Sequence, residues 1–156
     1  MCIPDFRDNG LLPRGIFDVT LPEIQGRFGN GKPANCRPRL FRNFRLFIKE
    51  LLAWGHASEI IMYGSFVTSK PDPSDIDLLL FVEPGFDFDR LRPKVIYGFD
   101  LICLAADSPG RDGVIDHFRF DNKGENEKGL LRLRLSRMGR PFRRPARRMT
   151  FAGATR

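Results

Sequence analysis

Residues 63–80, YGSFVTSKPDPSDIDLLL, join two apolar runs through a Gly-Ser turn and a polar loop. The first run, residues 59–63, predicts a short strand. The second run continues without a polar residue to Val82, which is typical of a strand buried on both faces. Alternate residues of a strand point to one face, so Asp75 and Asp77 are expected to point the same way while their neighbours enter the core. The segment therefore predicts two strands, with paired carboxylates where the second begins.

Two adjacent carboxylates repel each other unless a cation lies between them. Mg²⁺ suits such a pair, because it usually takes one or two carboxylates together with substrate phosphates. Gly64 and Ser65 add backbone N–H groups that can hold phosphate oxygens. There is a simpler interpretation of each feature: the Gly-Ser turn can end a strand and cap a short helix, and paired aspartates are more often a solvated strand face. The buried strand that follows Asp77 favours the metal site.

A third carboxylate is expected in a neighbouring strand. Residues 95–104, VIYGFDLICL, are apolar except for Asp100, their only charge. A buried, unpartnered carboxylate is costly, so Asp100 is expected to face the other two aspartates or to be capped by backbone N–H groups. Asp87 and Asp89 follow the turn signal Pro84-Gly85 and are interpreted as a loop or the first turn of a helix.

The order of these motifs resembles the nucleotidyltransferase signature of the DNA polymerase beta superfamily: Gly64-Ser65, a gap of nine residues, then Asp75-Ile76-Asp77. The resemblance covers roughly residues 59–104. It implies an α+β (mixed α/β) fold, in which a small mixed β-sheet is flanked by helices as in the palm-like nucleotidyltransferase fold. It also implies two Mg²⁺ ions and transfer of a nucleoside monophosphate from a nucleoside triphosphate to a hydroxyl.

The same resemblance assigns roles to individual residues. Asp75, Asp77 and Asp100 would be the catalytic and metal-binding residues, with Asp100 also the base for the incoming hydroxyl. Gly64 and Ser65 would bind the nucleotide. Lys70, in the loop between the motifs, can reach a phosphate, but a solvated lysine is the favoured interpretation.

The flanking segments are similar to those of a bacterial family of small nucleotidyltransferase-like proteins, on motifs at residues 12–15, 20–23, 27–29, 117–120 and 128–129. This similarity spans about residues 11–135 and includes no second domain that would grip a base or a template. Minimal nucleotidyltransferases often act as antitoxins beside a helical toxin, and some transfer AMP to a tyrosine of that toxin. The resemblance thus implies ATP as one candidate substrate and a toxin or other protein as one candidate acceptor. Nothing in the sequence distinguishes ATP from the other triphosphates.

Charge is distributed unevenly along the chain. Residues 1–135 hold 19 basic and 19 acidic residues, whereas residues 136–156 hold seven arginines and no acid. We therefore expect an N-terminal segment (1–10), one domain (11–135) and a basic, disordered tail (136–156). The tail either contacts nucleic acid or an acidic partner through counterion release, or has no selected partner.

Two functions of other classes stay open: a catalytically silent module that binds a nucleotide or a partner, and nucleic-acid binding through the tail. The chain has no apolar run of membrane-spanning length and no signal peptide, so no membrane partner is expected. Three scattered cysteines favour a reducing cytoplasm, and two distant histidines do not suggest a zinc site or a catalytic triad.

Further elements are predicted from periodicity and capping. The expected elements are an irregular lead-in over 11–17, a helix over 21–28 with the capping box Thr20–Glu23, a helix over 37–54 whose exposed face carries Arg39, Arg42, Arg45 and Lys49, a weak helix at 90–95, a helix at 114–118 and a half-exposed strand over 128–135.

Overall fold

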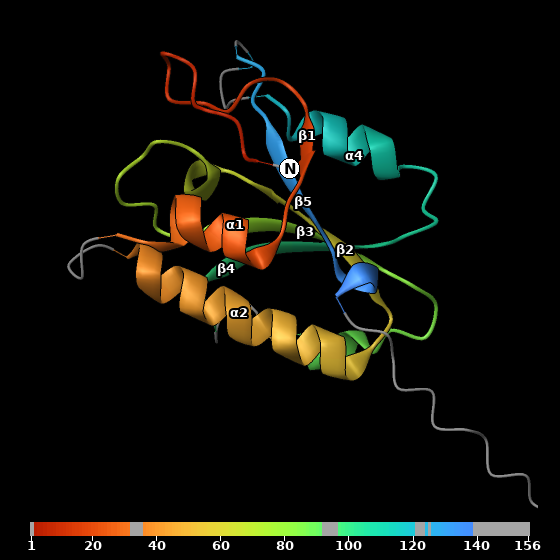
Figure 1. Ribbon diagram of the computed structural model, residues 1–156. Coiled ribbons are helices and arrows are strands. Elements are labelled where there is room, and N and C mark those ends of the chain that lie inside the picture. Colours follow the sequence, from red (N-terminus) through yellow and green to blue (C-terminus); the bar gives the residue numbers. More distant parts are fainter. Residues whose placement is uncertain (1, 32–35, 92–96, 121–123, 125, 139–156) are drawn as a thin grey trace, which may run out of the picture.

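The computed structural model describes residues 2–31, 36–91, 97–120, 124 and 126–138 (Figure 1). Its strands are β1 (Ile16–Asp18), β2 (Ala57–Tyr63), β3 (Ile76–Val82), β4 (Phe99–Ala105) and β5 (Leu130–Arg134). Its α-helices are α1 (Leu21–Ile24), α2 (Arg37–Trp54) and α4 (Arg111–His117). Among these described helices, none is long and apolar enough to cross a membrane.

The strands form one five-stranded mixed sheet in the order β1-β5-β2-β3-β4. β1 runs parallel to β5 and β3 parallel to β4, whereas β2 is antiparallel to both of its neighbours. This arrangement confirms the expected α+β class with a small mixed sheet and flanking helices.

The two faces of the sheet are covered unequally. One face shares a large core with α2, through Ile60, Met62, Leu78, Leu80, Leu131 and Leu133 of the sheet. The other face shares a smaller core with α4, through Ile61, Tyr63, Leu79, Phe81 and Leu130. α2 has 18 residues but α4 only seven, so α4 is roughly 10 Å long and covers part of strands about 23 Å long (Figure 1). Because alternate residues of β3 point to one face, Asp77 lies on the same face as Leu79 and Phe81, which pack against α4. It is near the end of the sheet that α4 does not cover.

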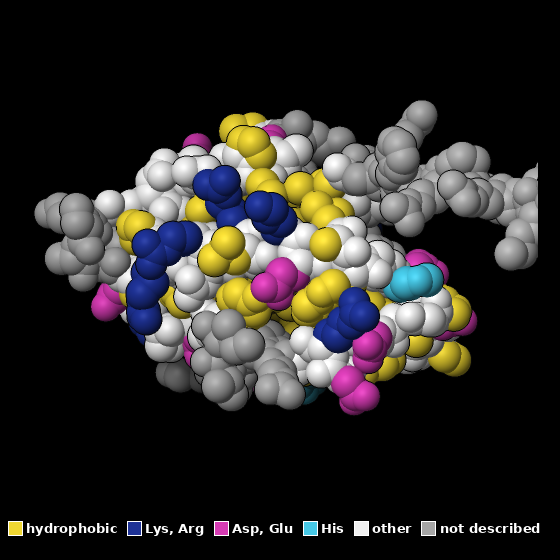
Figure 2. Space-filling view, turned by 90° about the horizontal axis from the view of Figure 1, so that it is seen from below, with side chains coloured by type: hydrophobic (Ala, Val, Ile, Leu, Met, Phe, Trp, Pro, Cys, Tyr) yellow, Lys and Arg dark blue, Asp and Glu magenta, His cyan; other side chains and the backbone are white. Residues whose placement is uncertain are grey.

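The predicted helix over 37–54 is confirmed in α2. Leu40, Phe41, Phe44, Phe47, Ile48 and Leu51 are buried, whereas Leu52 and Leu46 are exposed. Gly55, with φ of 74°, ends the helix, and its N–H donates to the Leu51 carbonyl at 3.0 Å. The expected solvated face is also confirmed, since Arg39, Arg42, Arg45 and Lys49 are exposed. Figure 2 shows this underside of the molecule, with Lys and Arg side chains spread among apolar and acidic ones.

The other predicted elements are confirmed with small shifts of their ends. The Thr20–Glu23 capping box is present: the Thr20 N–H donates to Glu23 Oε2 at 2.8 Å, and the Glu23 N–H donates to Thr20 Oγ1 at 3.4 Å. α1 then widens into a π-helical turn, Gln25–Gly29. The predicted helix at 114–118 is α4, and the predicted last strand is β5.

The irregular lead-in predicted over 11–17 is wrong at its end, because Ile16–Asp18 forms β1. Three residues are too few to show a strand period, and β1 is held by contacts distant in sequence. Asp18 Oδ1 accepts hydrogen bonds from Arg132 Nε at 2.5 Å and Arg134 Nε at 3.3 Å across the parallel pair.

Two further predictions concern the segment after β3. Asp87 accepts a hydrogen bond from the Asp89 N–H at 3.1 Å and caps a 3₁₀ turn at Phe88–Arg90, which confirms the interpretation of these aspartates as a loop and first helical turn. The weak helix at 90–95 falls largely on residues 92–96, outside the described part of the chain. The predicted tail likewise lies outside it from residue 139 onward.

Candidate functional site

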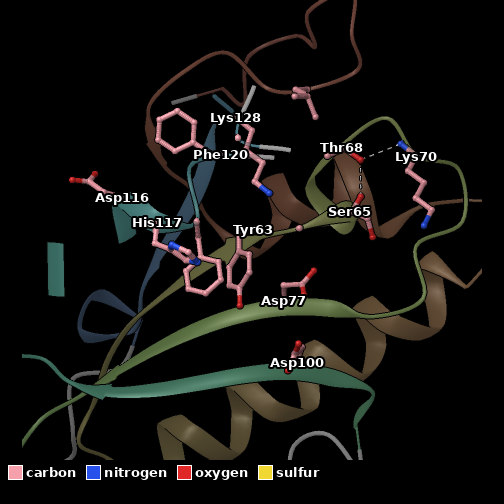
Figure 3. A pocket seen from close by; sticks show the side chains of 14 residues that line it. Tyr63, Ser65, Thr68, Lys70, Asp77, Asp100, Asp116, His117, Phe120 and Lys128 are labelled. Atoms are coloured by element: carbon pink, nitrogen blue, oxygen red, sulfur yellow. Dashed lines mark hydrogen bonds between the residues drawn. The ribbon is translucent and has the colours of Figure 1, made fainter. Parts of the chain in front are cut away.

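A cleft of about 1170 Å³ opens where β2 ends and β3 and β4 begin (Figure 3). It lies on the α4 face, at the end of the sheet that the short helix leaves uncovered. The cleft is lined by the first residue of the domain, three strands, the loop after β2, the end of α4 and the segment before β5. The lining residues are Leu11, Tyr63, Gly64, Ser65, Thr68, Lys70, Asp77, Asp100, Asp116, His117, Phe118, Phe120, Gly124 and Lys128.

Two of the predicted carboxylates meet at the floor of this cleft. Asp77 is paired with Tyr63 of β2 on one side and with Asp100 of β4 on the other. Paired residues of neighbouring strands point to the same face about 5 Å apart, so the two carboxylates are neighbours (Figure 3). Asp77 is half-buried, whereas Asp100 is exposed. The expected juxtaposition of Asp77 and Asp100 is therefore present.

Asp75 is placed differently. It precedes β3, is half-buried and accepts a hydrogen bond from Ser74 Oγ at 3.2 Å, but it does not line the cleft. Within the described ranges, no group of three or more His, Cys, Asp or Glu side chains is arranged to hold a metal ion. The site thus offers a pair of facing carboxylates, with Asp75 beside them.

The floor of the cleft carries an excess of negative charge. Burial raises the pKa of Asp77 to about 6, and the nearby charges of Asp75 and Asp100 add to the rise, which Lys128 partly opposes. Burial also raises the pKa of Tyr63, with smaller contributions from Asp77 and Asp100. A carboxyl with a raised pKa resists ionisation, and a bound cation would relieve that resistance.

Gly64 allows the Gly-Ser turn to lie directly on Asp77. Its φ is 70°, and a Cβ at this position would lie 1.6 Å from Asp77 Oδ2. Any larger residue would therefore strain the backbone and displace the carboxylate. The turn continues as a 3₁₀ helix, Ser65–Val67, which is closed when Thr68 Oγ1 donates to the Ser65 carbonyl at 2.8 Å.

A buried arginine holds the loop after the Gly-Ser turn. The Arg37 guanidinium donates to the carbonyl oxygens of Phe66 at 2.8 Å, Thr68 at 3.0 Å and Pro71 at 3.3 Å, and also to that of Lys70. Sequence reasoning gave this residue no role beyond starting a helix. One signal was present: a cation in the first turn opposes the helix dipole, so it needs another reason to be there.

Two further contacts fix the same loop. Asp72 Oδ1 accepts a hydrogen bond from the Cys36 N–H at 2.9 Å, at the start of α2. The Ser69 N–H donates to the Gly10 carbonyl at 2.9 Å, in the N-terminal segment. The loop that faces the carboxylates is therefore braced from both sides.

Sequence reasoning also missed the wall opposite this loop. The Tyr63 ring lies 4.3 Å from the Phe118 ring, centroid to centroid, and the His117 ring stands edge-on to Phe118 at 5.0 Å. Phe120 follows them along the cleft, and Lys128 points toward the floor between Tyr63 and Ser65 (Figure 3). Only a loose aromatic run in the sequence hints at this wall. Lys70 also lines the cleft but is exposed, so its two interpretations both stand.

Fold and site together define an α+β protein that carries a carboxylate pair beneath a braced Gly-Ser loop. The profile of DUF6932, a family of unknown function, matches residues 4–134, and the chain belongs to this family. No curated protein and no solved structure matches the chain.

Proposed function

We propose that this protein is a Mg²⁺-dependent nucleotidyltransferase, which moves a nucleoside monophosphate from a nucleoside triphosphate to a hydroxyl acceptor and releases pyrophosphate. The observation that supports this most is the pairing of Asp77 with Asp100 directly under the Gly64-Ser65 turn. Carboxylates and phosphate-binding amides converge at one cleft, as this chemistry requires.

The donor set fits Mg²⁺. It offers hard carboxylate oxygens and a carboxylate, Asp77, whose ionisation is disfavoured by burial and by its acidic neighbours. The close approach of Gly64 leaves Asp77 no bulky neighbour on that side. Asp77 and Asp100 would hold the metal, with Asp75 adjacent, and triphosphate oxygens and water would complete its ligands. Two bound ions would neutralise the phosphates and lower the pKa of the acceptor hydroxyl.

Other residues of the chain bind the triphosphate, accept a proton or position the loop. Ser65 and the backbone N–H groups of the turn up to Val67 bind the triphosphate, because those of Thr68, Ser69 and Lys70 already donate within the chain. Lys70 and Lys128 face the triphosphate from two sides of the cleft. Asp100, exposed at the floor, accepts the proton of the incoming hydroxyl. Arg37 acts at a distance, because its bonds to the loop carbonyls keep the amides in position.

The acceptor is a hydroxyl on a partner protein, as in an antitoxin, and the reaction takes place in the cytoplasm, where the free cysteines Cys2, Cys36 and Cys103 are stable as thiols. The test uses each α-labelled triphosphate with Mg²⁺ and a host lysate. We expect label on an acceptor with the wild type and with the control Asp89→Asn, and none with Asp77→Asn/Asp100→Asn. No labelling by the wild type with any triphosphate would count against group transfer.

A silent binding module is the second candidate. It is favoured by one observation, the position of Asp75 outside the cleft lining, which leaves two facing carboxylates rather than three. Binding of Mg²⁺-nucleotide without transfer or pyrophosphate release would select this alternative. Nucleic-acid binding through the tail concerns residues outside the described part of the chain and stays a prediction, tested by truncation after Leu135.

A further inference from the structure

We infer that the cleft contains a nucleobase subsite, with the exposed ring of Phe120 as its stacking surface. The subsite is part of what we call the aromatic wall: Tyr63, His117, Phe118 and Phe120. This inference rests on the proposed function. It specifies where the base of the nucleotide is bound and which class of base fits.

The wall has an inner and an outer part. The Tyr63 and Phe118 rings pack against each other at an interplanar angle of 35°, and Tyr63 is buried, so these rings form the inner part of the wall. Phe120 is different, because the residue is 45% exposed although it lines the cleft. A large apolar ring left open at the rim of a polar cleft is a surface on which a flat partner gains stability by stacking.

Backbone contacts hold Phe120 in relation to the floor. Phe120 pairs with Glu127 through an antiparallel bridge, and the Lys128 N–H donates to the Arg119 carbonyl at 2.6 Å. The same pair of backbone segments therefore carries the stacking ring and the lysine that points to the carboxylates (Figure 3). A ligand can touch both without a rearrangement of the chain.

The direction of the ligand follows from its chemistry. The α-phosphate must lie at Asp77 and Asp100, and the β- and γ-phosphates extend toward the loop with Ser65 and Lys70 on one side of the cleft. The nucleoside leaves the α-phosphate in another direction. Figure 3 shows the loop and the aromatic wall on opposite sides of the carboxylates, so the base extends toward Phe120. Since stacking grows with ring area, a purine is favoured over a pyrimidine.

The test separates the base from the phosphates. Calorimetry would compare Mg²⁺-ATP with Mg²⁺-tripolyphosphate, which has the phosphates but no base, on full-length wild type and on Phe120→Ala. We expect Phe120→Ala to weaken ATP binding by about 5- to 100-fold and to leave tripolyphosphate binding unchanged. Phe120→Trp should restore ATP binding. Phe88→Ala is the matched control, since Phe88 is 54% exposed at the opposite end of β3.

Each contrary outcome has its own meaning. Equal ATP affinity in wild type and Phe120→Ala would overturn the subsite and leave the proposed function standing. So would tripolyphosphate binding as tight as ATP in the wild type, because the base would then contribute nothing. Equal loss of both ligands in Phe120→Ala would also overturn it, as the ring would act on the phosphates or on the fold. No binding of either ligand by the wild type would overturn the proposed function as well.

Discussion

Asp77→Asn is expected to stabilise the metal-free protein at neutral pH. Asp77 is half-buried beside Asp75 and Asp100, and its pKa is raised from 3.8 to about 6. The unfolded chain carries this charge in water without such neighbours. Replacing the carboxylate by the isosteric amide removes the charge only where it is unfavourable, in the folded state.

The magnitude follows from the two pKa values. A rise from 3.8 to about 6 corresponds to at most ~3 kcal/mol of the free energy of unfolding. Because the carboxylate is only half-buried, water screens part of this, and we expect about 1–1.5 kcal/mol. For a chain of this size the melting temperature should rise by roughly 3–6 °C.

The stability that Asp77→Asn gains over the wild type must increase with pH. The folded protein keeps the Asp77 proton up to about pH 6, whereas the unfolded chain releases it near 3.8, so the wild type loses stability as the pH rises between these values. The advantage of Asp77→Asn should be absent below about pH 3.8, grow up to about pH 6 and stay constant above. Denaturant unfolding in EDTA from pH 4 to 8 measures it, with Asp89→Asn as the control.

Mg²⁺ should make the wild type more stable than Asp77→Asn. If Asp77 helps to hold the ion, millimolar Mg²⁺ stabilises the wild type and does little for Asp77→Asn. A variant that is less stable than the wild type at pH 7.5 in EDTA would refute the electrostatic reasoning. An equal response of both proteins to Mg²⁺ would refute the role of Asp77 as a ligand.

The remaining predictions concern the loop above the carboxylates. Gly64→Ala should abolish Mg²⁺-nucleotide binding and lower the free energy of unfolding by at least about 1 kcal/mol, because its Cβ would collide with Asp77. Gly113→Ala is the control: it lies in α4 with open space around it and should stabilise the protein by about 0.5–1 kcal/mol. Arg37→Lys should lower the free energy of unfolding by about 2–4 kcal/mol in denaturant unfolding, since a lysine cannot donate to all of the same loop carbonyls. Its control is the exposed Arg39→Lys, which should change that free energy by less than about 0.5 kcal/mol. Wild-type stability in Arg37→Lys, or nucleotide binding by Gly64→Ala, would contradict the roles given to these residues.

Local patterns predicted most of the fold. α2 could be predicted over its full length because its apolar period, its length and the stop at Gly55 all agree. β3 could be predicted because an unbroken apolar run is typical of a strand buried on both faces. β1 could not, since its three residues are held by pairing with β5 and by the ion pairs of Asp18, which local sequence does not contain.

For the site as well, some features could be predicted from local sequence and others could not. Asp77 and Asp100 could each be predicted at a strand, but their pairing depends on the order and register of β3 and β4. The closeness of Gly64 to Asp77, the loop contacts of Arg37 and the aromatic wall all join segments far apart in sequence. No period or motif encodes such contacts, so only the folded chain reveals them.

The most direct test of the proposed carboxylate site is calorimetric titration of each nucleoside triphosphate, with and without Mg²⁺. The proteins compared are the wild type, Asp77→Asn/Asp100→Asn and the control Asp89→Asn. We expect Mg²⁺-dependent binding by the wild type and the control, and no binding by the double variant in its folded state. A folded wild type that binds none of the triphosphates, or a double variant that binds as tightly as the wild type, would contradict the proposed site.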